Sequence, residues 1–493
     1  MKKIIILLLI LVPVYFAAAQ SEVDALRYSQ TYFGASARSM GMAGAFGSVG
    51  ADMSTLSSNP AGIGLYKRTE MTLTPLLHEG TTNSSFLGNS EETSNYNFDL
   101  QNAGAVFTFQ SRDKRSEWSH FQFGIGVNRL RDFNNEMRIA GNNSSANGTI
   151  MKPFADYASE YGTIEGLENN AAFDALLAYE ADLLYDVDGD PDNGYQWGYD
   201  AIYGGVFQQK NVKTSGSLDE VFISFGGNYQ DKLYMGASLG IQSIDYSENS
   251  TYYEVDAADT IPVFNSLTKY DKLETTGSGI NLKLGAIYRL NEWLRVGLAY
   301  HTPTFYGSMR DVYSSEMEAS LTYDEQEGAV SNQSERSAGE FDYELITPSR
   351  VIGSATALVS QYGLISVDYE MVNYSTASLD SDNFDFATSN TYISREFKRQ
   401  NNLRLGTEWR YESFYFRGGY AIYGSPYKNS GDFGETTFQT FGLGYRDGSF
   451  SIDFAYVNAE RSDTYYIYDK NYVEAAVNDY KQDQYVLTVG FQF

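Results

Sequence analysis

The chain has 493 residues, a formal net charge of −28 and no cysteine. The missing cysteines exclude a disulfide scaffold, cysteine-ligated zinc and a thiol nucleophile, and the acidic charge argues against a nucleic-acid partner. Tyr (41), Phe (30) and Gly (45) are frequent while Pro (9) is rare. This composition is typical of many β-strands with interfacial aromatic residues, although a large secreted β-sandwich shares part of it.

Residues 1–19 are predicted to form a secretory signal peptide. Lys2 and Lys3 precede an apolar run over 4–16, and the small residues 17–19 predict cleavage after Ala19. The run is too short to span a bilayer comfortably, and nothing after it resembles a stop-transfer segment. Loss of both lysines would change the charge from −28 to −30. No other stretch approaches a spanning helix, so a membrane-spanning form of this chain has to be a β-barrel.

Residues 20–65 lie before the first predicted strand and lack sustained alternation of apolar and polar residues. They are rich in Gly, Ala and Ser, and Asn59 precedes a proline, which favours extended backbone at Asn59. The tetrapeptide alone predicts no more than an Asx-type turn after a small-residue linker. The residues singled out in this segment are Gly41, Gly44, Asn59, Pro60, Ala61 and Gly62.

Residues 66–493 are predicted to form a transmembrane antiparallel β-barrel, so the fold class is all-β. Apolar and polar or small residues alternate over 121–128, 294–301, 403–410, 450–457 and 485–493, which places the apolar set on lipid and the other set in the lumen. The alternation predicts these residues in the lumen: Arg295, His301, Arg404, Glu408, Arg417 and Asp453. Two interpretations stay open for them, a salt-bridged ladder or an arginine that meets a ligand carboxylate.

The connections between strands alternate in length. Short polar turns are predicted at 111–117, 229–232, 289–292, 360–362, 411–413 and 446–449. Longer segments are predicted at 80–95, 134–217, 247–271, 308–339, 376–394, 425–435 and 460–481. Short periplasmic turns and long extracellular loops follow this order in bacterial barrels, and the count gives about 14 strands.

The largest predicted loop, 134–217, contains an amphipathic helix over 165–186. The helix either packs the loop onto itself or lines an outward groove for an apolar ligand. The residues proposed for such a groove are Phe173, Leu176, Leu177 and Leu184.

The strand over 121–128 is followed by charged residues where the lipid face should continue. Asn128, Arg129 and Leu130 mark this change. The strand has either left the membrane there or bends in a bulge that could serve as a lateral gate.

Catalytic and metal sites find little support. The three histidines, His78, His120 and His301, lie on different predicted strands or strand ends, and neither G-x-S-x-G nor H-E-x-x-H is present. The acidic segment 186–194 fails the calcium-loop template, because Pro191 takes the glycine position and Trp197 the final glutamate position. We expect no enzyme activity, no cofactor and no metal.

Three stretches resemble one known family. The segment 32–45 (YFGASARSMGMAGA), followed by 51–56 (ADMSTL) and 58–62 (SNPAG), resembles the hatch of the FadL/TodX-type outer-membrane transporters of long-chain fatty acids and other hydrophobic compounds. Segments 296–305, 402–409 and 417–426 are similar to strands of that family. Only the hatch motif is specific.

The resemblance implies a fourteen-stranded barrel in the bacterial outer membrane with residues 20–65 as a plug in its lumen. It implies passive uptake of a fatty-acid-like molecule from a loop groove into the lumen and sideways through the wall, past lipopolysaccharide. The terminal Phe493 resembles the signal by which the barrel-assembly machinery recognises such proteins. Two alternatives remain: a related barrel that serves type IX secretion as a shuttle or assembly component, and a structural barrel without cargo.

Overall fold

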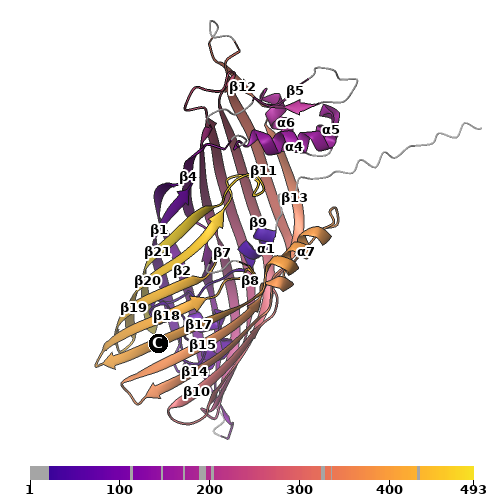
Figure 1. Cartoon of the computed structure of the whole chain (residues 1–493). Coiled ribbons are helices and arrows are strands. Elements are labelled where there is room, and N and C mark those ends of the chain that lie inside the picture. The colour runs from indigo at the N-terminus through magenta and orange to yellow at the C-terminus, as the bar shows by residue number, and fades with distance from the viewer. Residues whose placement is uncertain are drawn as a thin grey trace, which may run out of the picture.

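The computed structural model describes residues 22–111, 115–145, 148–169, 173–187, 196–200, 205–323, 328–334, 336–429 and 433–493. The predicted signal peptide, 1–19, lies outside the described residues. In Figure 1 the strands form a tall tube with tilted walls, short turns at the lower end and small helices at the upper end. No helix in the described ranges is both long and apolar enough to cross a membrane.

The tube is a closed antiparallel barrel of 14 strands, which confirms the predicted fold class and strand number. Eleven of the barrel strands are single elements: β1 (Glu70–Phe86), β2 (Asn89–Gln110), β7 (Val206–Tyr229), β8 (Leu233–Val255), β9 (Phe264–Arg289), β15 (Gly363–Asn373), β17 (Arg399–Tyr411), β18 (Phe414–Tyr423), β19 (Thr436–Asp447), β20 (Phe450–Tyr465) and β21 (Ala476–Gln492).

Three barrel strands are each interrupted once and carry two labels. They are β3 (Trp118–Asp132) with β4 (Asn135–Asn143), β10 (Leu294–His301) with β11 (Phe305–Leu321), and β13 (Ser337–Ile346) with β14 (Arg350–Val359). Two short strands, β12 (Val330–Gln333) and β16 (Ser378–Asp380), extend the sheet at its upper part. The barrel closes where β1 pairs with β21, from Glu70 opposite Gln492 to Ser85 opposite Val477. Closure removes the free sheet edge that a membrane could not tolerate.

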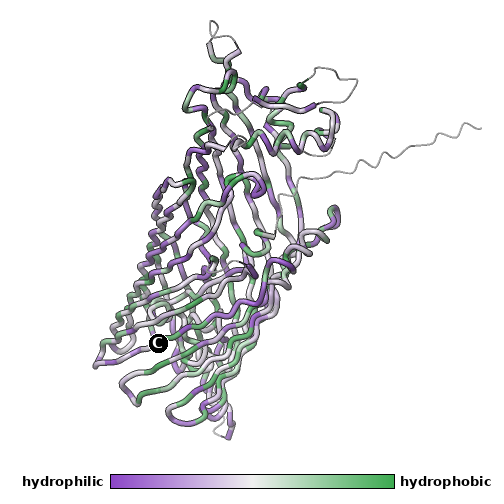
Figure 2. The backbone as a smooth tube through the Cα atoms, in the orientation of Figure 1, coloured by the Kyte–Doolittle hydropathy of each residue, from purple (hydrophilic) through white to green (hydrophobic). Residues whose placement is uncertain are grey.

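An apolar belt surrounds the lower part of the barrel. It consists of large apolar side chains that point outward at alternate positions. Because the protein does not cover these side chains, only membrane lipid can remove them from water. Figure 2 shows such hydrophobic positions alternating with polar ones along the lower strands. Each barrel strand contributes, in chain order Leu73, Phe98, Ile125, Phe225, Leu239, Leu284, Leu298, Val359, Ile365, Leu405, Phe416, Phe441, Phe454 and Leu487.

Exposed aromatic residues border the belt on both sides. Below it lie Tyr288, Trp293, Tyr362 and Tyr411, and above it lie Tyr96, Tyr300, Tyr369, Tyr420 and Tyr485. Aromatic girdles of this kind mark the two membrane interfaces of outer-membrane barrels. They define the spanning part of each strand.

The six short turns and the seven longer connections separate the barrel strands in the predicted order, but most of the longer connections are shorter than predicted. β8 and β9 continue over most of 247–271, and β1 and β2 meet in a two-residue turn at Leu87 and Gly88, both with positive φ. Water surrounds the strands above the belt, so their outer faces are polar and the alternation that reveals a strand disappears. The segments 308–339 and 460–481 are shortened in the same way.

The connection between β4 and β7 carries three helices, α4 (Met151–Tyr161), α5 (Ile164–Asn169) and α6 (Phe173–Glu180), and a small hairpin of β5 (Tyr185–Asp186) and β6 (Trp197–Gly198). The predicted helix over 165–186 is correct only in part: α5 and α6 lie in this range, but α6 ends at Glu180. Asp182 adopts a left-handed conformation, and the Leu183 N–H donates to the Ala178 carbonyl. This Schellman motif stops the helix.

Candidate functional site

The N-terminal segment, residues 22–66, packs inside the barrel. It contains α1 (Glu22–Ser29), α2 (Ala37–Met40), α3 (Ser54–Ser57) and the 3-10 helix η1 (Pro60–Leu65). α2 contacts β19, β20 and β21, whereas η1 contacts β7, β8 and β9. The segment therefore bridges opposite parts of the wall, and its small residues allow this close packing.

Asn59 holds the end of the segment in place. Its side-chain carbonyl accepts from the Ala61 N–H (3.2 Å) and its amide donates to the Gly47 carbonyl (2.6 Å), while Pro60 occupies the first turn of η1. Ala61 and Gly62 are buried. This is the Asx-type cap expected from an asparagine before a proline.

Two glycines of the motif show why no larger residue fits. A Cβ on Gly41 would lie 3.0 Å from Cα of Gly442 in the wall, and Gly44 has a φ of +70° with Phe33 against it. The wall contributes glycines that sequence reasoning missed. A Cβ on Gly236 would lie 2.1 Å from the Pro60 carbonyl oxygen, and one on Gly285 would lie 2.0 Å from the Asn59 side-chain oxygen. Both glycines occupy lumen-facing positions of β8 and β9, and this phase in the sequence is the signal that could have identified them.

The six predicted lumen residues all lie on the inner face, and most of them hold the N-terminal segment or each other. Glu408 accepts from Arg38 of α2 (2.9 and 2.8 Å) and from Arg417 (2.6 Å), and Arg417 also donates to Asp453 (2.6 Å). These contacts are those of the salt-bridged ladder. Arg38, which completes it, was missed, although it is the single charged residue within 34–47.

The other lumen residues behave in the same way. Arg295 donates to the Val49 carbonyl (3.0 Å), and Nε2 of His301 lies 2.6 Å from the Ser58 carbonyl oxygen. Arg404 pairs with Glu370 (3.1 Å). A further missed residue, Asp368, accepts from the backbone N–H groups of Phe46 (3.1 Å) and Gly47 (2.9 Å).

A large cavity, here called the vestibule, lies above the N-terminal segment. Its volume is about 550 Å³. One part of its lining is apolar and includes Phe33, Met40, Leu76, Phe438 and Ala459. Its other lining residues include four arginines and several carboxylates, among them Arg27, Arg131, Arg461, Asp132, Glu248 and Asp463.

Three of these arginines, Arg27, Arg131 and Arg461, differ in their partners. Arg27 pairs with Asp24 (2.5 Å) and lies 4.4 Å from the ring centre of Tyr246. Arg131 donates to the Arg27 carbonyl (2.7 Å), and Arg461 lies 4.6 Å from the ring centre of Tyr480. Within the part of the chain that the structure describes, no carboxylate lies within 4.0 Å of the Arg131 or Arg461 guanidinium. Both cations can therefore accept an anionic ligand.

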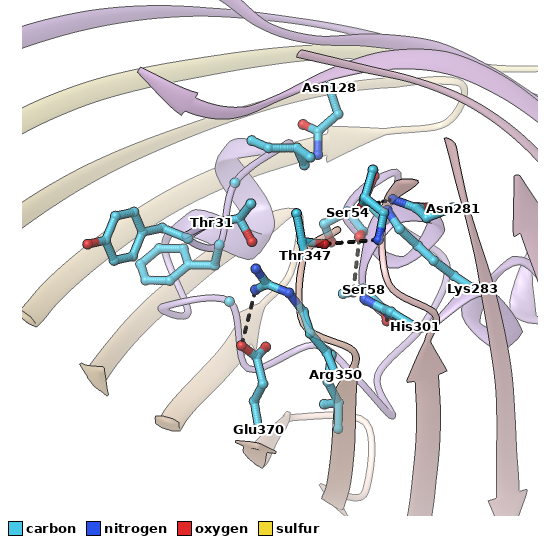
Figure 3. A pocket seen from close by; sticks show the side chains of 18 of the residues that line it. Thr31, Ser54, Ser58, Asn128, Asn281, Lys283, His301, Thr347, Arg350 and Glu370 are labelled. Atoms are coloured by element: carbon cyan, nitrogen blue, oxygen red, sulfur yellow. Dashed lines mark hydrogen bonds and ion pairs between the residues drawn. The ribbon is translucent and has the colours of Figure 1, made fainter. Parts of the chain in front are cut away.

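A second, smaller cavity of about 90 Å³, the inner cavity, lies between the N-terminal segment and the wall. Figure 3 shows Lys283, His301, Arg350 and Glu370 reaching from the wall toward Ser54, Ser58 and Thr31. His301 and Arg404 are the two predicted lumen residues among its lining. Tyr32, Phe33 and Leu130 line both cavities, so they form the constriction between them.

The wall beside the vestibule contains a seam between β2 and β3/β4. The β2–β3 ladder ends at Asn102 opposite Asn128, and above this point side chains of β2 replace the backbone ladder. Four of them bond across the seam at four-residue intervals: Asn89 to the Ala140 carbonyl (3.1 Å), Thr93 to the Glu136 carbonyl (2.6 Å), Asn97 to Asp132 (3.3 Å) and Gln101 to the Arg129 carbonyl (2.8 Å).

The three residues proposed for a lateral gate lie at the lower end of this seam. Asn128 forms the last ladder pair, Arg129 pairs with Asp99 across the seam and with Asp219 of β7 (3.0 Å), and Leu130 is the bulged residue between two registers of β3 and β7. Leu130 and Arg129 also line the vestibule. A bulge at this point is one of the two interpretations that the sequence left open for these residues.

The residues proposed for a loop groove lie elsewhere. Leu177 and Leu184 are buried in the apolar cluster that α4, α5 and α6 form with the upper strands, and Leu176 packs against it. Phe173 meets Tyr313 edge to face (5.9 Å). None of the four lines the vestibule or the inner cavity, and this packing is the one expected of a loop folded onto itself.

Buried polar contacts hold the helices α4, α5 and α6 on the upper end of the barrel. Burial raises the pKa of Glu254 at the upper end of β8, and the carboxyl accepts from the Ile150 N–H (3.2 Å) and the Tyr252 hydroxyl (2.6 Å). Burial disfavours the charged form of Lys269. The nearby carboxylates of Asp174 in α6 and Asp271 nevertheless hold the pKa of Lys269 above its ordinary value. The Lys269 ammonium lies 3.1 Å from Asp174.

No group of three or more metal-ligating side chains is found in the described ranges. Most of the acidic segment 186–194 lies outside them. His78, His120 and His301 are on β1, β3 and β10.

Comparison with known proteins identifies the fold. No protein-family model and no curated protein sequence matches the chain. Solved structures do match: a Pseudomonas aeruginosa FadL homologue (TM-score 0.59, 13% identity, 94% of this chain and 100% of that chain), the Pseudomonas putida toluene transporter TodX (0.54, 13%, 94% and 100%) and the Ralstonia pickettii toluene transporter TbuX (0.51, 16%, 94% and 99%).

These likenesses confirm, at the level of the fold, the resemblance to FadL/TodX-type transporters. Two of these structures are of toluene transporters, and the third is of a FadL homologue. A closed barrel of this fold with an exterior apolar belt is an outer-membrane protein, as predicted.

Proposed function

We propose that the protein is a passive outer-membrane uptake channel for hydrophobic molecules that carry an anionic head group, such as long-chain fatty acids. The observation that carries the proposal is the vestibule, which combines an apolar lining, two arginines without a carboxylate partner among the described residues, and a side wall that ends at the seam. Its volume of about 550 Å³ falls in the range of pockets that enclose small-molecule ligands.

The vestibule suits the two ends of an amphipathic ligand. Arg131 and Arg461 can hold a carboxylate by charge-assisted hydrogen bonds. Leu76, Met40 and Phe438 offer apolar surface to the hydrocarbon chain, whose removal from water contributes about 0.8 kcal/mol for each methylene group. A neutral aromatic molecule would use the apolar part alone.

The proposed path leaves the vestibule sideways. The N-terminal segment acts as the plug of the lumen, since it is held to the wall by Glu408, Asp368 and Arg295. The ligand passes the constriction at Tyr32, Phe33 and Leu130 and leaves at the lower end of the seam. An apolar solute then enters hydrocarbon directly and avoids a full aqueous crossing.

The proposal is tested by uptake into liposomes that contain the purified protein. In the variant Arg131→Gln/Arg461→Gln we expect the half-saturating concentration of a long-chain fatty acid to rise about a hundredfold or more, because two charge-assisted bonds of about 1.5 kcal/mol each are lost. Uptake of the uncharged methyl ester should not change. Ala459→Trp, which fills the vestibule, should reduce uptake of both, and Arg310→Gln on the outer surface should affect neither.

Mass spectrometry of lipid extracted from the purified protein is a second test, because it identifies any bound ligand. Bound fatty acids or similar amphipathic molecules support the proposal. Absence of any apolar ligand, together with uptake equal to that of empty liposomes, overturns it. A secretion defect on deletion of the gene would then favour the type IX secretion role.

A further inference from the structure

The outer surface above the apolar belt carries mixed charge over most of the barrel. Exposed Asp245 of β8, Glu274 of β9 and Asp479 of β21 lie on the same outward face as the belt residues of their strands, and Lys272 pairs with Glu274 and Arg310 with Glu340. Acids and bases that stand side by side leave little net attraction for the phosphate groups of the outer leaflet.

One part of this surface is basic. It lies beside α7 (Ala387–Glu396), which stands at the upper ends of β15 and β17 (Figure 1) and packs against α1. The basic sector consists of Arg395 at the end of α7, Lys398, Arg399 at the start of β17, and Lys428. Arg395, Arg399 and Lys428 are exposed, and Lys398 is half-buried.

Backbone contacts hold these four residues together. The Lys428 ammonium donates to the Ser394 carbonyl (2.8 Å) and the Lys428 N–H donates to the Glu396 carbonyl (2.8 Å). The Lys398 N–H donates to the Pro426 carbonyl (2.8 Å). The sector is therefore a fixed arrangement of two chain segments and not a set of independent surface side chains.

Little negative charge offsets the sector. Glu396 pairs with Arg395 (2.8 Å), but within the described ranges no carboxylate lies within 4.0 Å of the charged groups of Lys398, Arg399 or Lys428. The acidic residues of the same connection, Asp380, Asp382 and Asp385, precede α7, and Asp385 accepts from the Ala387 N–H at the start of that helix. They lie at the opposite end of α7 from the sector.

The basic sector lies at the height of the membrane surface. Arg399 shares the outward face of β17 with Leu403 and Leu405, and Leu403 pairs with Tyr369 of the upper aromatic girdle. Four residues of a strand tilted by about 45° rise by roughly 9 Å. This distance places Arg399 at the level of lipid head groups, directly above the hydrocarbon.

We propose that the basic sector binds the phosphate groups of an outer-leaflet glycolipid, the lipid A part of lipopolysaccharide. Guanidinium and ammonium groups form charge-assisted hydrogen bonds with phosphate oxygens, and basic residues near an anionic membrane surface each contribute attraction. The sector thereby fixes one side of the barrel to the lipid around it. The proposal does not depend on transport.

The test measures binding of fluorescent lipopolysaccharide to the full chain in detergent. The variant Arg395→Gln/Lys398→Gln/Arg399→Gln/Lys428→Gln should bind at least about tenfold more weakly than the unmodified protein. A control variant with the same charge change, Lys152→Gln/Lys272→Gln/Arg310→Gln/Lys481→Gln, should stay within about twofold. Heat-modifiable electrophoretic mobility shows that each variant is folded. If the fourfold variant fails to fold, Arg399→Gln/Lys428→Gln replaces it.

Two further binding measurements identify which molecule supplies the phosphate groups. Lipopolysaccharide with dephosphorylated lipid A should lose the same affinity as the basic-sector variant, and millimolar inorganic phosphate should not displace the intact lipid. Equal binding by the basic-sector variant, an equal loss in the control variant, or unchanged affinity for the dephosphorylated lipid overturns the proposal. Efficient displacement by inorganic phosphate overturns its lipid part. Fatty-acid uptake into liposomes free of lipopolysaccharide should not change in the basic-sector variant.

Discussion

Glu408 shows at the scale of single residues how the lumen tolerates buried charge. Its carboxylate lies between the guanidinium groups of Arg38 and Arg417, and all three side chains are nearly inaccessible to solvent. A buried charge is costly unless it is paired, so each of these residues makes the others acceptable. The same contacts join α2 to β17 and β18.

We expect Glu408→Gln to destabilise the folded barrel by about 3–5 kcal/mol, because it leaves two buried arginines with one negative partner fewer. Equilibrium unfolding in urea with the protein in lipid vesicles measures this loss. Glu340→Gln, which removes the partner of Arg310 in an exposed pair, should change stability by less than about 1 kcal/mol. Equal effects of the two substitutions would show that Glu408 does not hold the N-terminal segment.

The seam shows what one element contributes. β2 pairs with β1 over most of its length, from Asn89 to Val106, but with β3 only from Asn102 to Gln110. A continuous backbone ladder is rigid, whereas side-chain bonds every four residues can break one at a time. Within the barrel wall, β2 therefore has one fixed edge and one edge that can separate.

Since the chain has no native cysteine, a disulfide can lock this edge specifically. We expect oxidised Asn97→Cys/Asp132→Cys to lose most fatty-acid uptake in liposomes and to regain it on reduction, because these two side chains face each other across the seam. The control, Glu79→Cys/Tyr96→Cys, joins paired residues of β1 and β2 at the same height and should not affect uptake. Full uptake by the oxidised seam variant would exclude the seam as the exit.

The molecule as a whole is divided by height into a lipid-facing and a water-facing part. Below the upper aromatic girdle, the outside is apolar and the inside is polar. Above it, the outside is polar and the inside contains the apolar cluster beneath α4, α5 and α6, and strands such as β8 and β9 continue far beyond the membrane. The vestibule lies inside this upper part, where the barrel wall encloses it.

This division predicts a strong dependence of substitution effects on height. Leu298 lies in the belt with 59% of its surface exposed, and Leu298→Arg should destabilise the barrel in lipid vesicles by about 2–4 kcal/mol. Asp245→Arg, on the outward face above the belt, should change stability by about 1 kcal/mol or less. Similar losses at both positions would contradict the assignment of the membrane boundary.

The sequence by itself determined the features that depend on local pattern. Alternation with a period of two residues identified the spanning strands, such as 294–301 and 450–457, and the six short turns gave their number. The inward phase placed Arg404, Glu408 and Arg417 in the lumen. These predictions succeeded because a strand in a membrane has one apolar and one polar face, which any single segment reveals.

The tertiary structure decided what depends on residues far apart in the chain. Arg27, Arg131 and Arg461 meet in one cavity although they come from α1, β3 and β20, and Arg38 reaches Glu408 across the lumen. The seam follows from the register of β2 against β3, and the extensions above the belt follow from strand pairing in water. No local pattern encodes these features, because they arise from barrel closure and from which inward faces meet the N-terminal segment.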